Sequence, residues 1–368
     1  TDLSRISGAF VIGRSTAFSY KGKSRDPKQI GRELNVRYVL DGSLQRAGNR
    51  MRVNVQLIEA ETGAHLWAER FDKPLADLFD MQDEIVAHLA RQLDTRLIDA
   101  EARRAERAPH PDSLDLYFQG RSLFYHSISP ESLGKAHGFF ERAVELDPDN
   151  IHALVGVAAV EAAVAVSFMT DDPESLLIAA EARLTKALAA RPNNAAAHLF
   201  MGVVLRASDR PQRSIEELEL ALAIDPNSAL ARALIGYALC SMGRSEEAEA
   251  HVLEALRLSP RDVLAFEWFL IAGLAKAYLG EFVEAVTWLR KSIDANRTRS
   301  LAFFSLAACL AHLGRQDEAR REVEAGLTVD PKFTLRRYRE GIRGDNATYF
   351  SQRMRLLEGM RLAGVPEG

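Results

Sequence analysis

Cysteine is scarce in this chain of 368 residues: only Cys240 and Cys309 occur, and they are far apart. Two isolated cysteines exclude the disulfide framework on which small secreted domains depend. An excess of positive charge is also absent, because 51 acidic side chains outnumber 47 basic ones and the net charge is −4. Without a basic field, the chain is not expected to bind nucleic acid.

Long hydrophobic runs are absent as well. The most apolar stretch extends from Ala153 to Met169, and Glu161 interrupts it. A membrane-spanning helix needs about 20 apolar residues without a central charge, so we expect a buried helix and no membrane partner. No secretory leader is visible, and the sequence opens at Thr1 without methionine. We therefore expect a cytoplasmic location and a chain that is part of a longer protein.

The motifs of common catalytic sites are missing too. No phosphate-binding loop, dinucleotide glycine fingerprint, zinc helix motif or nucleophile elbow occurs. The nine histidines are scattered, and none stands with a second histidine or a cysteine at metal-ligand spacing. The sequence therefore predicts no catalytic residue, no metal site and no cofactor. An unrecognised catalyst in the first hundred residues is the enzyme hypothesis, and turnover of ATP or GTP by the purified chain would support it.

What the sequence does contain is an internal repeat. Proline recurs at intervals of 34 residues, at Pro192, Pro226 and Pro260. Small side chains recur in register with these prolines, for example at Gly202, Gly236, Gly273 and Ala307, and at Ala180, Ser214, Ala248, Ala285 and Ala319. Proline cannot continue a helix, and small residues let two helices approach closely. The pattern predicts pairs of antiparallel helices that stack into a superhelix.

The period, the small residues and the closing Asp-Pro resemble the tetratricopeptide repeat (TPR). The resemblance implies six helix pairs over residues 109–331, stacked in a right-handed superhelix whose first helices line a concave groove. Repeat 1 carries four extra residues near 125–130, and repeat 2 carries about ten near 167–175. Residues 332–368 follow the last repeat, and we expect them to form a cap with a helix from about 346 to 363.

The resemblance also implies which residues face a partner, because fixed positions of each first helix line the concave groove of this family. These positions hold Leu199, Val203, Arg206, Ala233, Tyr237, Leu270, Leu274, Tyr278, Phe304 and His312. The lining is apolar and aromatic, and the Lys and Asn with which some members clamp a peptide carboxylate are absent from the matching positions. It predicts a protein or peptide partner, supplied by another molecule or by a segment of this chain.

The first hundred residues follow a different pattern. Apolar and polar side chains alternate from Met51 to Leu57, and turn residues precede and follow this run. Such alternation is typical of antiparallel strands. We expect three strands, at 39–46, 51–59 and 64–71. Around them we expect a short strand at 10–13, a helix at 27–34 and a long helix at about 75–107.

Long phrases of this part, such as LSRISGAFVIGRSTAFSYKGK at 3–23 and DLFDMQDEIVAHLA at 77–90, resemble the TolB-like α/β domain. That domain precedes TPR repeats in the C-terminal half of bacterial class III adenylate and guanylate cyclases, and the tail KFTLRRYREG at 332–341 is similar as well. The resemblance implies an α+β fold class: a small α/β TolB-like domain over residues 1–108, incomplete at its N-terminus, followed by the all-α TPR solenoid.

The same resemblance implies a function. It indicates a non-catalytic protein–protein interaction and regulatory region of a multidomain bacterial signalling protein, with the cyclase catalytic domain absent from this chain. Similar segments follow winged-helix domains in some transcriptional regulators. The effector half of such a regulator is therefore the alternative, and the domain encoded upstream would discriminate between the two.

Overall fold

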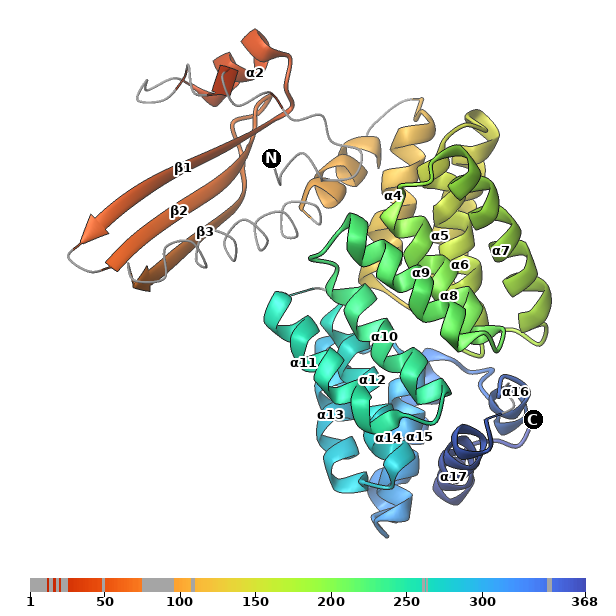
Figure 1. Ribbon diagram of the computed structural model, residues 1–368. Coiled ribbons are helices and arrows are strands. Elements are labelled where there is room, and N and C mark those ends of the chain that lie inside the picture. The colour runs from red at the N-terminus through yellow and green to blue at the C-terminus, as the bar shows by residue number, and fades with distance from the viewer. Residues whose placement is uncertain are drawn as a thin grey trace. The chain divides into compact units, whose positions relative to one another are not determined.

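The computed structural model describes residues 12, 16–17, 20, 26–47, 50–74, 96–106, 110–259, 262, 264–342 and 346–368. The chain divides into two compact units, residues 1–100 and 101–368. The first unit contains helix α2 (Pro27–Leu34) and an antiparallel sheet of order β1-β2-β3 (Figure 1), formed by Tyr38–Ala47, Arg50–Glu59 and His65–Pro74. The three strands and the helix predicted at 27–34 are confirmed.

The sheet has one apolar and one polar face, as the alternation requires. Met51, Val55 and Leu57 of β2 are buried, and Leu97 of the helical residues 96–106 packs against them. Arg52, Asn54 and Gln56, which alternate with the apolar residues of β2, are polar and only partly covered. Almost all of the predicted strand at 10–13 and most of the predicted helix at 75–107 lie outside the described residues.

The second unit consists of paired helices that follow one another along the chain (Figure 1). Each first helix packs on its own second helix and also on the first helix of the next repeat. The pairs are α4 (Ser113–His126) with α5 (Pro130–Leu146), α6 (Ile151–Val166) with α7 (Pro173–Ala190), α8 (Ala195–Ala207) with α9 (Pro211–Ile224), α10 (Ala229–Ser241) with the short η3 (Ser245–Glu247) and α11 (Ala248–Leu258), α12 (Ala265–Leu279) with α13 (Phe282–Ala295), and α14 (Ser300–His312) with α15 (Gln316–Val329).

Local capping explains where α6, α8 and α10 begin. Asn150, Asn194 and Ser228 stand two residues after a proline of the repeat, and each side chain accepts a hydrogen bond from the backbone N–H three residues later. Such N-caps satisfy amide groups that have no partner within the helix. The proline therefore ends one helix, and the cap two residues later starts the next.

The small repeat residues lie where the two helices of a pair meet. A Cβ atom on Gly202 would stand 2.7 Å from Cγ of Leu218, and one on Gly236 would stand 2.9 Å from the carbonyl oxygen of Ala248. In the third repeat the Ser214 hydroxyl donates a 2.6 Å hydrogen bond to the Gly202 carbonyl oxygen. These approaches leave no room for a larger side chain, which is the physical reason for the repeated glycine, alanine and serine.

Helix α6 contains the most apolar stretch of the sequence, and its single charge is paired. Glu161 is 5% exposed, and Nη1 of Arg183 lies 2.9 Å from one carboxylate oxygen. His137 of α5 faces the same carboxylate at 3.8 Å. Among the described residues, no helix is both long and apolar enough to span a membrane.

The C-terminal segment, defined here as residues 332–368, contains α16 (Leu335–Glu340) and α17 (Ala347–Ala363). Asn346 caps the start of α17, and Gly364 ends it in a left-handed conformation, so the helix predicted at about 346–363 is confirmed. The main packing partners of α17 are α14 and α12, which are first helices, and it packs less on the final second helix α15. The segment thus covers first helices, whereas a helix that extended the stack would pack mainly on α15.

Candidate functional site

The first-helix face, defined as the ten predicted site residues on α8, α10, α12 and α14, is largely covered. Four of its members, Leu270, Leu274, Tyr278 and Phe304, are at most 2% exposed. They belong to one buried cluster that also includes residues of the C-terminal segment: Phe333, Leu335, Tyr338, Tyr349, Leu356, Leu357, Met360, Ala363 and Val365. The chain itself therefore covers the last two repeats of the face.

Aromatic stacking and hydrogen bonds both contribute to this contact. The rings of Phe304 and Phe333 stack with centroids 3.9 Å apart and planes inclined by 12°. His312 lies at the end of the same face, half-buried, with Nε2 2.9 Å from the backbone oxygen of Arg355. Its ring also stacks on Phe282 at 4.5 Å. The first half of α14, through Phe304, and its last residue, His312, thus both contact the C-terminal segment.

Five other members of the first-helix face lie outside the buried cluster, and most of them pack against other repeats. Leu199 packs with α9 and α10, and Ala233 packs with Trp268 in the next repeat, so both lie between neighbouring repeats. Val203 is half-buried against the second repeat. Arg206 and Tyr237 are also half-buried, and the Arg206 guanidinium carbon lies 4.0 Å from the centre of the Tyr237 ring. Tyr237 packs against the buried cluster.

The insertion in repeat 2 also reaches the C-terminal segment. Phe168 packs on Tyr338, with ring centroids 4.9 Å apart, and Asp171 pairs with Arg337 through two hydrogen bonds of 2.7 and 3.0 Å. Ser167 accepts a hydrogen bond from the buried Arg299, which begins the last repeat. The extra residues that interrupt the repeat pattern therefore join the second repeat to the end of the chain.

The extra residues of repeat 1 make a similar connection. The backbone N–H of Ile128 donates a 2.9 Å hydrogen bond to the Thr298 hydroxyl, across 170 positions of sequence. The Asn296 side-chain amide donates to the His126 carbonyl oxygen at 3.4 Å. Both irregular repeats thus contact the loop before α14. The positions of the insertions were visible in the sequence, but their partners were not.

Arg353 of α17 was not predicted as a site residue, yet it lies at the centre of this contact. It is 3% exposed, and its Nη1 lies 3.1 Å from the Tyr349 hydroxyl. Its guanidinium carbon lies 4.4 Å from the centre of the Tyr338 ring. A basic residue on an otherwise buried helix face, at i+4 from Tyr349 and i−3 from Leu356, is the sequence signal that could have identified it.

Burial favours the neutral form of several titratable groups in the second unit. Burial raises the pKa of the Cys240 thiol to about 12, and it raises that of Cys309 to about 12 as well. Burial also raises the pKa of Tyr278 well above its usual value. In the described part of the chain, no group of three or more His, Cys, Asp or Glu side chains is placed to hold a metal ion.

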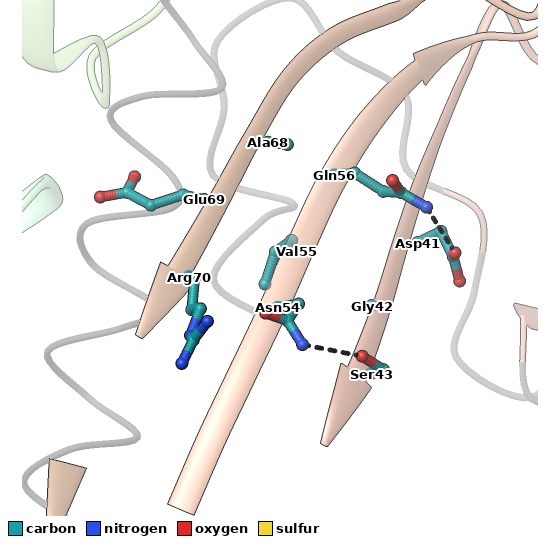
Figure 2. A pocket seen from close by; sticks show the side chains of 9 residues that line it. All are labelled: Asp41, Gly42, Ser43, Asn54, Val55, Gln56, Ala68, Glu69 and Arg70. Atoms are coloured by element: carbon teal, nitrogen blue, oxygen red, sulfur yellow. Dashed lines mark hydrogen bonds between the residues drawn. The ribbon is translucent and has the colours of Figure 1, made fainter. Parts of the chain in front are cut away.

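The sheet of the first unit carries a shallow open pocket of about 350 Å³ (Figure 2). Its polar side chains are held by cross-strand hydrogen bonds, from Gln56 to Asp41 at 2.9 Å and from Asn54 to Ser43 at 3.2 Å. Residues from all three strands line it: Asp41, Gly42, Ser43, Asn54, Val55, Gln56, Ala68, Glu69 and Arg70. No motif of the sequence points to chemistry there, so the first-helix face remains the candidate site.

Comparison with protein families places a tetratricopeptide repeat model on residues 179–229. That match runs from within α7 through α8 and α9 to the first residue of α10, so it includes part of the second helix of repeat 2 and the whole of repeat 3. A curated protein of Rhizobium meliloti (strain 1021), named "Putative adenylate cyclase 3", is 40% identical over 173 residues. The alignment covers 46% of this chain and 28% of the relative, so the chain spans less than a third of that protein.

Solved structures with similar folds are remote in sequence. The human IFIT1 dimer with m7Gppp-AAAA is 16% identical with a TM-score of 0.50, over 64% of this chain and 55% of that one. The APC/C hetero-tetramer Cut9-Hcn1 is 15% identical with a TM-score of 0.49, over 71% and 48%. The resemblance to the first of these is one of fold alone. The second unit is a TPR-like solenoid, whereas the TolB-like character of the first hundred residues stays a prediction.

Proposed function

We propose that this chain is the non-catalytic protein–protein interaction and regulatory region of a multidomain bacterial signalling protein related to adenylate and guanylate cyclases. The observation that carries the proposal is the 40% identity to a protein named as an adenylate cyclase, together with the TPR match. Stacked helix pairs present extended surfaces to other proteins. A cytoplasmic location and an N-terminal TolB-like domain are part of the same proposal.

The partner proposed is a protein or peptide, bound through the ten residues of the first-helix face. The chemistry of these residues supports this choice, because eight of them are apolar or aromatic and only Arg206 is permanently charged. Apolar helical faces bind amphipathic helices. Nucleic acid is not a proposed ligand, because the face offers few cations for phosphate groups.

The test uses the whole protein from which the chain derives. Tyr237→Ala and Arg206→Ala alter half-buried members of the first-helix face, and Ile178→Ala, at a residue 63% exposed on α7, is the control. Formation of cyclic AMP and cyclic GMP is measured together with affinity capture of partner proteins. The proposal expects the first two variants to lose a captured partner and to change the regulation of cyclase activity, while the control does neither.

The opposite results would reject the proposal. If the parent protein has no cyclase domain, the proposed link to cyclase activity is rejected. If all variants show identical partner capture and identical activity, the first-helix face is rejected as the binding site. Nothing in the similarities described above favours the winged-helix alternative. A DNA-binding domain encoded upstream would be the observation in its favour.

A further inference from the structure

The C-terminal segment occupies, within this chain, the face on which the proposed function needs a partner to bind. Tyr349, Leu356 and Met360 of α17 are at most 5% exposed and belong to the same buried cluster as Leu274 and Phe304. An amphipathic helix laid on an apolar helical face is a recurrent form of peptide recognition. The segment thus has the form of a ligand that is covalently part of the chain.

Arg353 of α17 is a charged residue buried among aromatic side chains. Arg353 is 3% exposed, and the groups that face it are the tyrosines of α10, α12, α16 and α17. Its Nη1 lies 3.1 Å from the Tyr349 hydroxyl and 3.5 Å from the Tyr278 hydroxyl. Its guanidinium carbon lies 4.4 Å from the Tyr338 ring centre and 5.5 Å from that of Phe168. The positive charge therefore lies among aromatic groups, with no carboxylate among the described residues that face it.

Paired arginines of the same chain show what Arg353 lacks. In Arg315 and Arg337, Nε and Nη2 donate side by side to one carboxylate at 2.7 to 3.0 Å. The same two nitrogens of Arg353 are buried and meet no acceptor among the described residues. Cation–π contacts offset only part of the desolvation of a buried guanidinium. Arg353 therefore weakens the docking of α17 relative to an apolar residue of similar size.

We propose that residues 332–368 are an exchangeable internal ligand of the first-helix face, and that the site takes an amphipathic helix of a partner protein with an apolar side chain where Arg353 stands. The inference rests on the proposed function, for which it supplies the binding mode. The partner helix presents aromatic, leucine or methionine side chains at the spacing of Tyr349, Leu356 and Met360. Because it buries no unpaired charge, it can compete with an internal helix that has the advantage of a high effective concentration.

The structure also offers a way to open the segment by substitution. A Cβ atom on Gly359 of α17 would stand 2.7 Å from the Ala308 carbonyl oxygen and 2.7 Å from Cδ2 of His312. Gly359→Leu must therefore push α17 away from α14. Gly134 of α5 is the matched control, because a Cβ atom there meets nothing within 4 Å.

The first experiment measures hydrogen exchange of the α17 amides in the full chain. Arg353→Met removes the buried charge and keeps a long apolar side chain, so exchange of α17 is expected to slow at least tenfold. Gly359→Leu is expected to speed it at least tenfold, and Gly134→Leu is expected to leave it as in the wild type. Faster exchange in Arg353→Met would show that the arginine fastens α17, and that result would overturn the proposal.

The second experiment tests exchange in trans and keeps the proposal testable if a variant chain does not fold. Two labelled synthetic peptides are titrated into the wild-type chain, one with the sequence 346–365 and one with the same sequence carrying Arg353→Met. The proposal expects the second peptide to bind at least tenfold more tightly, and the Gly359→Leu chain to bind either peptide more tightly than the wild type. Equal binding of the two peptides, or binding that Gly359→Leu does not change, would overturn it.

The two proposals fail in different ways. These measurements need no partner, so a negative result rejects the exchangeable segment and leaves an interaction region that binds elsewhere. If α17 exchanges as expected but the parent protein captures no partner, the proposed function and its partner helix are rejected, and only the reversible docking of residues 332–368 stands.

Discussion

Phe333 stacks on Phe304 with ring centroids 3.9 Å apart and planes inclined by 12°, and both side chains are fully buried. Phe304 is a predicted partner-facing residue of the last repeat, and Phe333 belongs to the C-terminal segment. The contact therefore places the chain's own aromatic side chain on a residue that the repeat pattern assigns to a partner.

Phe333→Ala tests the strength of that contact. Removing a buried phenylalanine typically costs about 3–5 kcal/mol, so the free energy of unfolding should fall by that amount in urea titrations. Phe350→Ala is the control in the same segment, because Phe350 is 49% exposed. It should change stability by no more than about 0.5 kcal/mol. Equal stability of the two variants would contradict the packing of the segment on α14.

The repeat register makes a separate prediction at Gly236. A Cβ atom there would stand 2.9 Å from the Ala248 carbonyl oxygen, so Gly236→Leu should lower stability by about 1–3 kcal/mol or more. Gly134→Leu, on an open helix surface, should be neutral or stabilising, since glycine is a poor helix former. Thermal melting followed by circular dichroism measures both, and an unchanged midpoint for Gly236→Leu would disprove the register.

Positions with a local structural role show which parts of the fold the sequence can predict. Helix pairs are predictable because proline, N-caps and small residues act within a few residues of where they stand, as at Asn194 and Gly202. The period of the repeat then extends the prediction along the chain. The strands of the first unit are predictable for the same local reason, since the alternation around Val55 needs no distant partner.

The position of the C-terminal segment could not be predicted in this way. The sequence predicts the bounds of α17, because Asn346 and Gly364 cap it. Its placement depends on side chains far apart in sequence, such as Phe333 with Phe304 and Arg353 with Tyr278. The repeat pattern predicts which residues of each first helix form the first-helix face, but it does not predict which residues cover that face. The sequence predicts that a partner or a segment of this chain covers Leu274, but it cannot choose between the two.

A pH-dependent contribution to stability is expected from His137. The Glu161 carboxylate, followed by Glu141, raises the pKa of His137 above its ordinary 6.5, although burial opposes the shift. A base whose pKa is raised on folding adds stability that is full below the unfolded pKa of about 6.5 and is lost as pH rises through the folded pKa. The difference in unfolding free energy between wild type and His137→Gln should be largest at acidic pH and vanish at alkaline pH. A difference that does not vary with pH would contradict the ion pair.

The two thiols should be inert in the native chain. Cys240 and Cys309 are fully buried, and burial raises the pKa of each to about 12, so neither forms the reactive thiolate at neutral pH. A disulfide reagent such as DTNB should modify neither thiol while the chain is folded and both in urea. Rapid modification under native conditions would show that α10 or α14 is exposed.

A comparison of Leu274→Glu with Leu253→Glu tests most directly whether the C-terminal segment covers the first-helix face. Leu274 is 1% exposed on the first-helix face beneath the C-terminal segment, and Leu253 is 51% exposed on α11. A carboxylate at Leu274 would be buried, and a buried charge without a compensating partner typically costs about 3–5 kcal/mol. If the segment covers this face, Leu274→Glu lowers the unfolding free energy by that amount and removes hydrogen-exchange protection from residues 347–363. Leu253→Glu is expected to do neither. Wild-type stability and full protection of 347–363 in Leu274→Glu would contradict this prediction.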